Sequence, residues 1–195
     1  MTSGRAPGRP RDEAAEQAIL AAVVDLLREQ GFARLTIAEV AARAGVGKPT
    51  VYRRWPSKSE LVVDAIVRLA PPISARRSGD PLVDLRRLVR AATVELTSPP
   101  LGTTIITLLA DMHASPEFVA LVQERIARPR RGVVGEVIER AIASGRLRKD
   151  TDAEVMLDLL IGPLLYRWLI TGEALTRPVI DRVVDIVWES FAAEP

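Results

Sequence analysis

The chain has 195 residues, of which 48% are hydrophobic and 27% are charged, and its formal net charge is +2. These proportions indicate a folded protein with a sizeable core, and they exclude wholesale disorder. Because the chain has no cysteine, disulfide scaffolds, zinc fingers, iron–sulfur sites and thiol catalysis are excluded. Its one histidine excludes sites that need several histidines. We therefore expect no metal and no cofactor.

Two further classes of protein fit the sequence poorly. No apolar run reaches the roughly 18 residues that a membrane span needs, and the N-terminal segment lacks the apolar stretch of a signal peptide. We therefore expect a cytoplasmic protein without membrane contact. The sequence also lacks a Gly-rich phosphate loop and a recognisable pair of nucleophile and base, so we do not expect an enzyme.

Charge is distributed unevenly along the chain. Residues 1–70 contain 11 Lys and Arg against 8 Asp and Glu, whereas residues 71–195 contain 16 against 17. Three early arginines, Arg5, Arg9 and Arg11, lie in a Gly- and Pro-rich segment that precedes the first acidic residue. Such a segment is either a contact to a polyanion or a solvated terminus. We expect residues 1–11 to form a disordered basic arm.

Four helices are predicted in the N-terminal part. Apolar residues spaced by three and four predict a helix over residues 12–30, which Gly31 ends. A second helix, over 36–45, begins with the capping box Thr-Ile-Ala-Glu. A short helix follows over 48–54, and another capping box begins the helix over 57–70.

The C-terminal part is predicted to be helical too. The polar, Pro-rich segment 71–79 separates the two parts, which we expect to be domains over residues 12–70 and 80–195. Pro129 should kink or break the helix that contains it. The chain shows no strand pattern, so we expect an all-α fold with about nine helices. Beyond residue 80, helices are predicted from Pro81 to about 97 and over 101–113, 116–144, 153–171 and 178–192.

A helix-turn-helix motif is predicted between Thr36 and Trp55. Two short helices are joined by a turn that contains Gly45, which suits the positive φ angle of such a turn. The second helix carries cations, a hydroxyl and a phenol, and only Val51 and Trp55 offer it apolar anchors. A helix with this surface is suited to the major groove of DNA.

The stretch from Ile19 to Leu61 resembles the TetR family of bacterial transcriptional regulators. The resemblance implies an N-terminal three-helix helix-turn-helix DNA-binding domain and a larger C-terminal domain for ligand binding and dimerisation. The matching segments follow one another without gaps: Gly31-Phe32, Thr36-Ile37-Ala38-Glu39-Val40-Ala41, Ala44-Gly45-Val46, Thr50-Val51-Tyr52 and Trp55-Pro56-Ser57-Lys58-Ser59-Glu60-Leu61. Residues 160–167 resemble the late dimer-forming helix of one subgroup.

The resemblance also implies roles in DNA binding. We expect Thr36, Tyr52 and Lys58 to contact phosphates, and Arg54 to be among the residues that read bases. Many members of the family carry Ser or Thr where this chain has Gly47, so one phosphate contact lacks its hydroxyl. The predicted DNA-binding residues are Thr36, Ala38, Gly47, Lys48, Pro49, Thr50, Tyr52, Arg53, Arg54 and Lys58.

The C-terminal domain is expected to bind a small-molecule effector and to form a homodimer. Individually, the candidate pocket residues also suit a core or surface position. The basic run Arg125, Arg128, Arg130 and Arg131 is either an anion site or a solvated helix face. The candidate pocket residues are Leu109, Met112, His113, Phe118, Tyr166, Arg167 and Trp168. The candidate dimer residues, which could alternatively pack inside one chain, are Leu159, Leu160, Leu164, Ile180, Val184, Val187 and Trp188.

Together these features predict a sequence-specific transcriptional regulator. The expected mechanism is a homodimeric repressor that binds a palindromic operator in double-stranded DNA and is released by a small-molecule effector. The alternative is an architectural DNA-binding protein with weak sequence preference and no effector, although a net charge of +2 is low for that task.

Overall fold

The computed structural model describes residues 9–70, 73–74, 77–99, 101–102, 104–105 and 115–193. The chain divides into two compact units, and each is described by itself. The first comprises Met1–Leu69 and Thr103–Val122, and the second comprises Ala70–Gly102 and Gln123–Pro195. Throughout the described residues, regular structure is helical, apart from an isolated β-bridge between Leu147 and Ala192. None of the described helices is long and apolar enough to cross a membrane.

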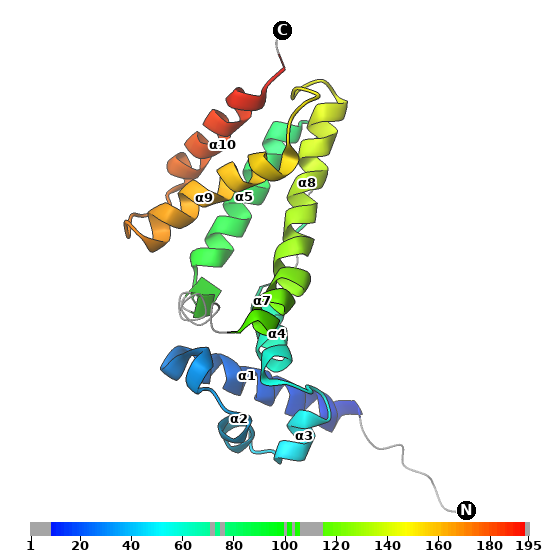
Figure 1. Cartoon of the computed structure of the whole chain (residues 1–195), viewed down its shortest axis with the longest axis vertical. Coiled ribbons are helices and arrows are strands. Elements are labelled where there is room, and N and C mark those ends of the chain that lie inside the picture. The colour runs from blue at the N-terminus through cyan, green and yellow to red at the C-terminus, as the bar shows by residue number, and fades with distance from the viewer. Residues whose placement is uncertain are drawn as a thin grey trace, which may run out of the picture. The chain divides into compact units, whose positions relative to one another are not determined.

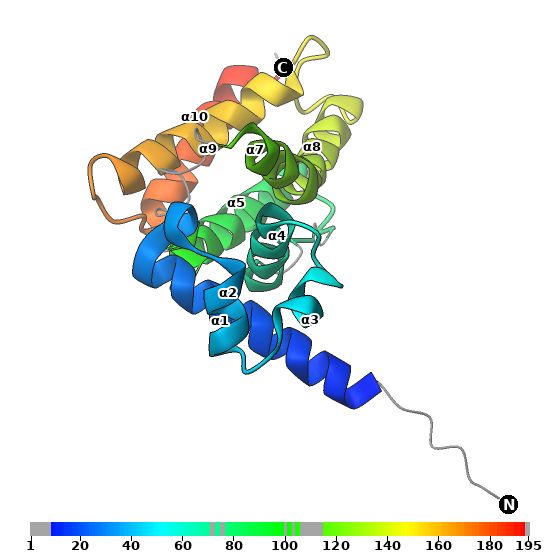
Figure 2. The ribbon, with the colours of Figure 1, turned by 60° about the horizontal axis from the view of Figure 1, so that its bottom comes forward.

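The first unit contains the helices of the predicted motif (Figures 1 and 2). Gly31 interrupts α1 at a φ of 77° and a ψ of 175°, a backbone conformation that is essentially restricted to glycine. The predicted stop at Gly31 is therefore confirmed as a sharp change of direction. The elements of this unit are α1 (Arg9–Arg34), α2 (Ile37–Arg43), α3 (Lys48–Tyr52), α4 (Lys58–Leu69) and α7 (Pro116–Val122).

The core of the first unit forms where α1, α4 and α7 pack together. Phe118 of α7 is fully buried, and its ring stacks on Phe32 with 4.3 Å between the ring centroids. Apolar faces of α1 and α4 complete this core with residues that include Val23, Leu27 and Leu61.

The second unit contains α5 (Pro81–Thr97), the π-helical turn η1 (Gln123–Ala127), α8 (Arg128–Ala143), α9 (Ala153–Leu169) and α10 (Arg177–Phe191). Figure 1 shows α5, α8, α9 and α10 packed alongside one another, and α5 contacts each of the other three. Their shared core is apolar and includes Leu85, Val137, Leu160 and Val184.

The predicted long helix over 116–144 is interrupted. A π-helical turn over Gln123–Ala127 precedes Pro129, which lies in the first turn of α8. Proline cannot donate a backbone hydrogen bond and its ring crowds the preceding turn, so the regular α-helical bonding pattern is lost there. Most of the helix predicted over 101–113 lies outside the described residues.

Asp84 is a buried carboxylate in the core of the second unit, with only 1% of its surface exposed. Its oxygens accept hydrogen bonds from the Ser78 backbone N–H at 2.8 Å and from the Arg140 guanidinium of α8 at 3.2 Å. Burial raises the pKa of Asp84, but the bonds from Ser78 and Arg140 outweigh burial and hold it below its ordinary value. The carboxylate thus joins α5, α8 and the segment that precedes α5.

We predict that Asp84→Asn lowers the free energy of unfolding by about 2–4 kcal/mol at neutral pH, because Arg140 loses its buried partner. Since folding lowers the pKa of Asp84, its contribution is present above about pH 4 and is lost as the pH falls through the lowered value. Urea unfolding across this pH range should show the difference between wild type and variant shrinking in acid. Asp150→Asn, whose exposed carboxylate lies 3.5 Å from Arg148, should change little. Equal losses in both variants would contradict this role of Asp84.

Candidate DNA interface, pocket and dimer surface

The short helix α3 is held by residues at its C-terminal end. Val51 and Trp55 are buried, which confirms both predicted anchors. The Trp55 indole N–H donates to the Asp64 carboxylate of α4 at 2.8 Å, so the ring is fixed in orientation as well as in place. The turn before α3 contains Gly45 at a φ of 67°, as the motif predicts.

The predicted capping box at the start of α2 is present. The Thr36 hydroxyl accepts from the Glu39 backbone N–H at 3.3 Å and donates to the Glu39 carboxylate at 2.7 Å. This second bond lowers the pKa of Glu39. Because its proton is donated to Glu39, the Thr36 hydroxyl must exchange partners before it can donate to a phosphate. Ala38 is exposed on the same turn.

The N-terminal part of α3 presents most of the predicted base-reading residues. Lys48, Pro49 and Tyr52 are exposed, with 52% of the Tyr52 surface accessible, and Thr50 is half-buried. Gly47 caps the helix without a side-chain hydrogen bond. A Cβ added to Gly47 meets only the Pro49 ring, at 3.5 Å, so the missing hydroxyl is not the result of a steric restriction.

Arg54, predicted to read bases, instead faces α1. Its guanidinium forms an ion pair with Glu16 and lies 2.8 Å from Asp12, and only 22% of the side chain is exposed. Its neighbour Arg53 is 65% exposed and lies 3.8 Å from Asp12. The position after α3 turns Arg54 back onto the first helix and leaves Arg53 accessible. The two acids are four residues apart on α1, a spacing that places both on one helix face and is visible in the sequence.

Lys58, predicted to contact a phosphate, is half-buried at the start of α4. Its ammonium donates to the backbone carbonyls of Phe32 and Ala33 at 3.0 and 3.4 Å. It also lies 4.3 Å from the centre of the Phe32 ring. Lys58 therefore closes the end of α1, because the last carbonyls of a helix have no partners within it.

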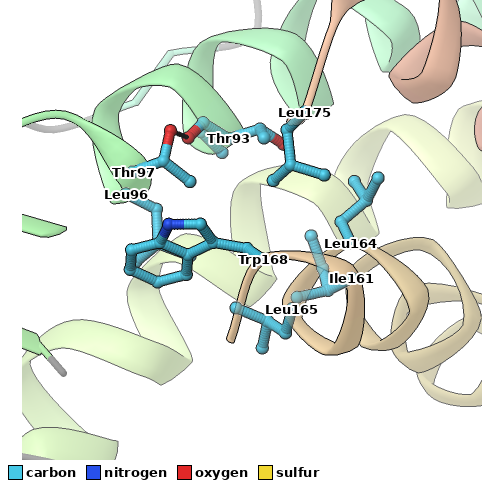
Figure 3. A pocket seen from close by; sticks show the side chains of 9 residues that line it. Thr93, Leu96, Thr97, Ile161, Leu164, Leu165, Trp168 and Leu175 are labelled. Carbon is cyan, nitrogen blue, oxygen red and sulfur yellow. Dashed lines mark hydrogen bonds between the residues drawn. The ribbon is translucent and has the colours of Figure 1, made fainter. Parts of the chain in front are cut away.

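The second unit contains an apolar pocket between α5, α9 and the segment that joins α9 to α10. Figure 3 shows the Trp168 indole reaching from α9 toward Leu96 and Thr97 of α5. The pocket is narrow, with a volume of about 30 Å³ open to the centre of a water-sized sphere, so it must widen to hold a drug-sized molecule. Both threonine hydroxyls in it donate to helix carbonyls, Thr93 to Val89 and Thr97 to Thr93. Its described lining consists of Ala92, Thr93, Leu96, Thr97, Ile161, Leu164, Leu165, Trp168 and Leu175.

Only Trp168 among the described candidate pocket residues lines this pocket. Tyr166 is 60% exposed, and Arg167 bonds to Glu173 at 3.0 Å and to a backbone carbonyl. Phe118 lies in the core of the first unit. Leu109, Met112 and His113 lie outside the described residues. The sequence signal that was missed is the pair of threonines at 93 and 97, placed four residues apart beside the apolar face of α5.

The basic run near η1 is partly neutralised within the second unit. Arg130 is paired with Glu95 at 2.5 Å, and Arg131 contacts Glu154 and, at 2.8 Å, Asp158. Hydrogen bonds to these two carboxylates raise the pKa of Arg131. These pairs favour the reading of a solvated, salt-bridged helix face over that of an anion site.

Most of the candidate dimer residues are buried inside one chain, which corrects the predicted surface. Leu159 alone is exposed, at 44%, because the others pack between the helices of the second unit. Leu159 belongs instead to a set of apolar residues that are exposed on α9, at its C-cap and on α10. The buried candidates are Leu160, Leu164, Ile180, Val184, Val187 and Trp188. The exposed set, which we call the outer stripe, consists of Val155, Leu159, Tyr166 and Ile170 with Ile186 of α10.

Comparison with known proteins assigns the chain to a family. Residues 76–187 match the family model described as "Tetracyclin repressor-like, C-terminal domain", and residues 19–65 match "Bacterial regulatory proteins, tetR family". The HTH-type transcriptional regulator YdeS of Bacillus subtilis is 34% identical over 189 residues, which cover 94% of this chain and 91% of YdeS. The chain belongs to the TetR family.

Other TetR-family proteins are similar along nearly the whole chain. The DNA-binding transcriptional repressor TetR of Mycobacteroides abscessus is 26% identical over 179 residues, covering 91% of this chain and 93% of the relative. The crystal structure of the TetR family transcription regulator SCO0332 matches with a TM-score of 0.71 and 28% identity. That match covers 91% of this chain and 98% of SCO0332. The protein is thus a DNA-binding transcriptional regulator, and the predicted all-α fold is confirmed.

Proposed function

We propose that this TetR-family protein is a repressor that binds a palindromic operator as a homodimer and is released by a small-molecule effector. The observation that carries the proposal is the exposed polar surface of α3, held by buried Val51 and Trp55. The similarity to the Mycobacteroides abscessus repressor supports repression as the outcome of binding.

The exposed residues of α3 divide by their chemistry. Lys48 and Thr50 offer hydrogen-bond donors to base edges, and Pro49 offers an apolar contact to a thymine methyl. We assign phosphate contacts to the exposed Tyr52 and Arg53, because such contacts fix the position of the helix in the groove. Thr36 and Ala38 lie at the start of α2, where backbone N–H groups add phosphate donors.

The outer stripe is the surface that we assign to the dimer. Its members on α9 and at the C-cap of that helix follow one another at intervals of four, seven and four residues, so they lie on one side of the helix. Exposed apolar residues that are contiguous on a surface commonly mark an interaction site. A single helix-turn-helix buries little DNA, and pairing two of them on half-sites about 34–36 Å apart supplies the missing specificity.

The apolar pocket is the site that we assign to the effector. None of its described lining residues is charged, and both threonine hydroxyl protons are already donated to backbone carbonyls. A charged compound would lose its hydration there without a partner. The effector is therefore an uncharged, mainly apolar molecule. Among the described lining side chains, the Trp168 indole N–H is the hydrogen-bond donor that such a molecule could use.

The test of DNA recognition is selection of bound sequences from a random pool at about 150 mM salt, where non-specific binding is weakened. We expect a palindrome whose half-sites lie about one helical turn apart. DNA that is retained without an enriched motif would favour the architectural alternative. In that case the outer stripe would need another explanation.

The dimer prediction is tested by sedimentation. Leu159→Glu places a charge in the outer stripe and should convert a dimer into a chain of 21.3 kDa, with operator affinity falling at the same time. Val94→Glu is the matched control, because Val94 is 59% exposed on α5 and lies outside the stripe. A Leu159→Glu protein that remains dimeric would show that the interface lies elsewhere.

The pocket prediction uses two neighbouring alanines. Ala92 lines the pocket, whereas Ala91 is exposed on the adjacent position of α5. In a screen of uncharged apolar compounds, those that release wild-type protein from DNA should fail on Ala92→Phe, since the new ring fills the space. They should still act on Ala91→Phe, and both variants should bind DNA normally without compound. Normal release of Ala92→Phe would place the effector elsewhere.

A further inference from the structure

Two acids of α1 neutralise arginines next to the recognition helix. Glu16 forms ion pairs with both Arg54 and Arg68, and Asp12 lies 2.8 Å from Arg54 and 3.8 Å from Arg53. Glu16 and Arg54 are about one-quarter exposed, at 24% and 22% of their side chains. Water therefore screens this pair less than it screens fully exposed charges.

These pairs change the charge that α3 presents to DNA. The segment from Lys48 to Lys58 contains four basic residues and no acidic ones. Arg54 faces two carboxylates, and Lys58 is bonded to backbone carbonyls. Lys48 and Arg53 are the basic side chains of this segment that remain well exposed.

We propose that Asp12 and Glu16 form an acidic clamp that keeps Arg54 off the DNA backbone and thereby lowers sequence-independent affinity. Each additional phosphate contact strengthens binding to every sequence alike. A regulator is useful in proportion to the ratio between specific and non-specific binding, because the genome offers many competing sites. The clamp raises that ratio without adding a base contact. The inference rests on DNA binding through α3 and requires neither the proposed operator nor the effector.

The experiment measures binding of the full-length protein to a mixed-sequence 30-bp duplex between about 50 and 200 mM salt. Opening the clamp with Asp12→Asn together with Glu16→Gln frees Arg54 to contact a phosphate. The slope of log K against log salt should steepen by about 0.9 per chain. For each new contact, the affinity should then fall roughly threefold more than in the wild type across the fourfold rise in salt.

A double-mutant cycle with Arg54→Gln separates the clamp from a general effect of charge. In the wild-type background Arg54→Gln should leave the slope unchanged, because Arg54 does not touch DNA. In the open-clamp background the same substitution should abolish the gain, so the two effects are not additive. An additive cycle, or a loss of about 0.9 per chain from Arg54→Gln alone, would overturn the proposal.

Two further measurements distinguish the proposed clamp from a purely structural role of Asp12 and Glu16. Thermal unfolding of each variant shows whether α3 stays folded, and a variant with weakened binding to all DNA and unchanged slope counts against the clamp. Asp25→Asn is the control for charge, since Asp25 lies on α1 but is paired with Arg28 at 3.8 Å. A slope change from Asp25→Asn equal to that from Glu16→Gln alone would also overturn the proposal.

Discussion

A helix of five residues cannot keep its shape in water by its own hydrogen bonds, and α3 is such a helix. Its shape depends on tertiary anchors at its C-terminal end. Val51 and Trp55 enter the core, Trp55 bonds to Asp64 of α4, and Arg54 bonds to acids of α1. The residues available to DNA are thus the α3 side chains that remain exposed when these anchors are buried or bonded. The same contacts that stabilise α3 decide which of its side chains can meet DNA.

Features with local causes were predictable from the sequence. The capping box at Thr36 and Glu39 depends on residues three apart, and the structure contains both of its hydrogen bonds. Gly31 and Gly45 occupy positive φ angles because the chain must turn there within a few residues. Val51 and Trp55 were identifiable as anchors because α3 has no other large apolar side chain facing inward. Signals of this kind need no knowledge of distant partners.

The contacts that the sequence did not predict depend on partners far apart in sequence. Arg53 and Arg54 are neighbouring residues of the same type, but the Arg54 guanidinium bonds to Glu16, 38 residues earlier in the chain. Helix α9 is apolar nearly all round, so periodicity could not tell its inward face from its outward one. Prediction therefore chose Leu160 and Leu164 for the dimer, whereas the structure buries them in the core. Phe118 was predicted to line a pocket, but its ring stacks on Phe32. This contact joins residues from opposite halves of the chain, so local sequence patterns do not indicate it.

The π-helical turn lies at the point of the sequence where the two units divide. The division between the two units falls between Val122 and Gln123, where α7 gives way to η1. No loop intervenes, so α7 and α8 are joined through continuous helical backbone. π-Helical turns are rare, occur mostly as single turns inside α-helices and are frequent at functional sites. In the first unit, α7 supplies Phe118 to the ring of Phe32, and that ring also holds the Lys58 ammonium at the end of α1. The helix that leads out of the first unit thus takes part in the contacts that close the end of α1, just before the DNA-binding motif.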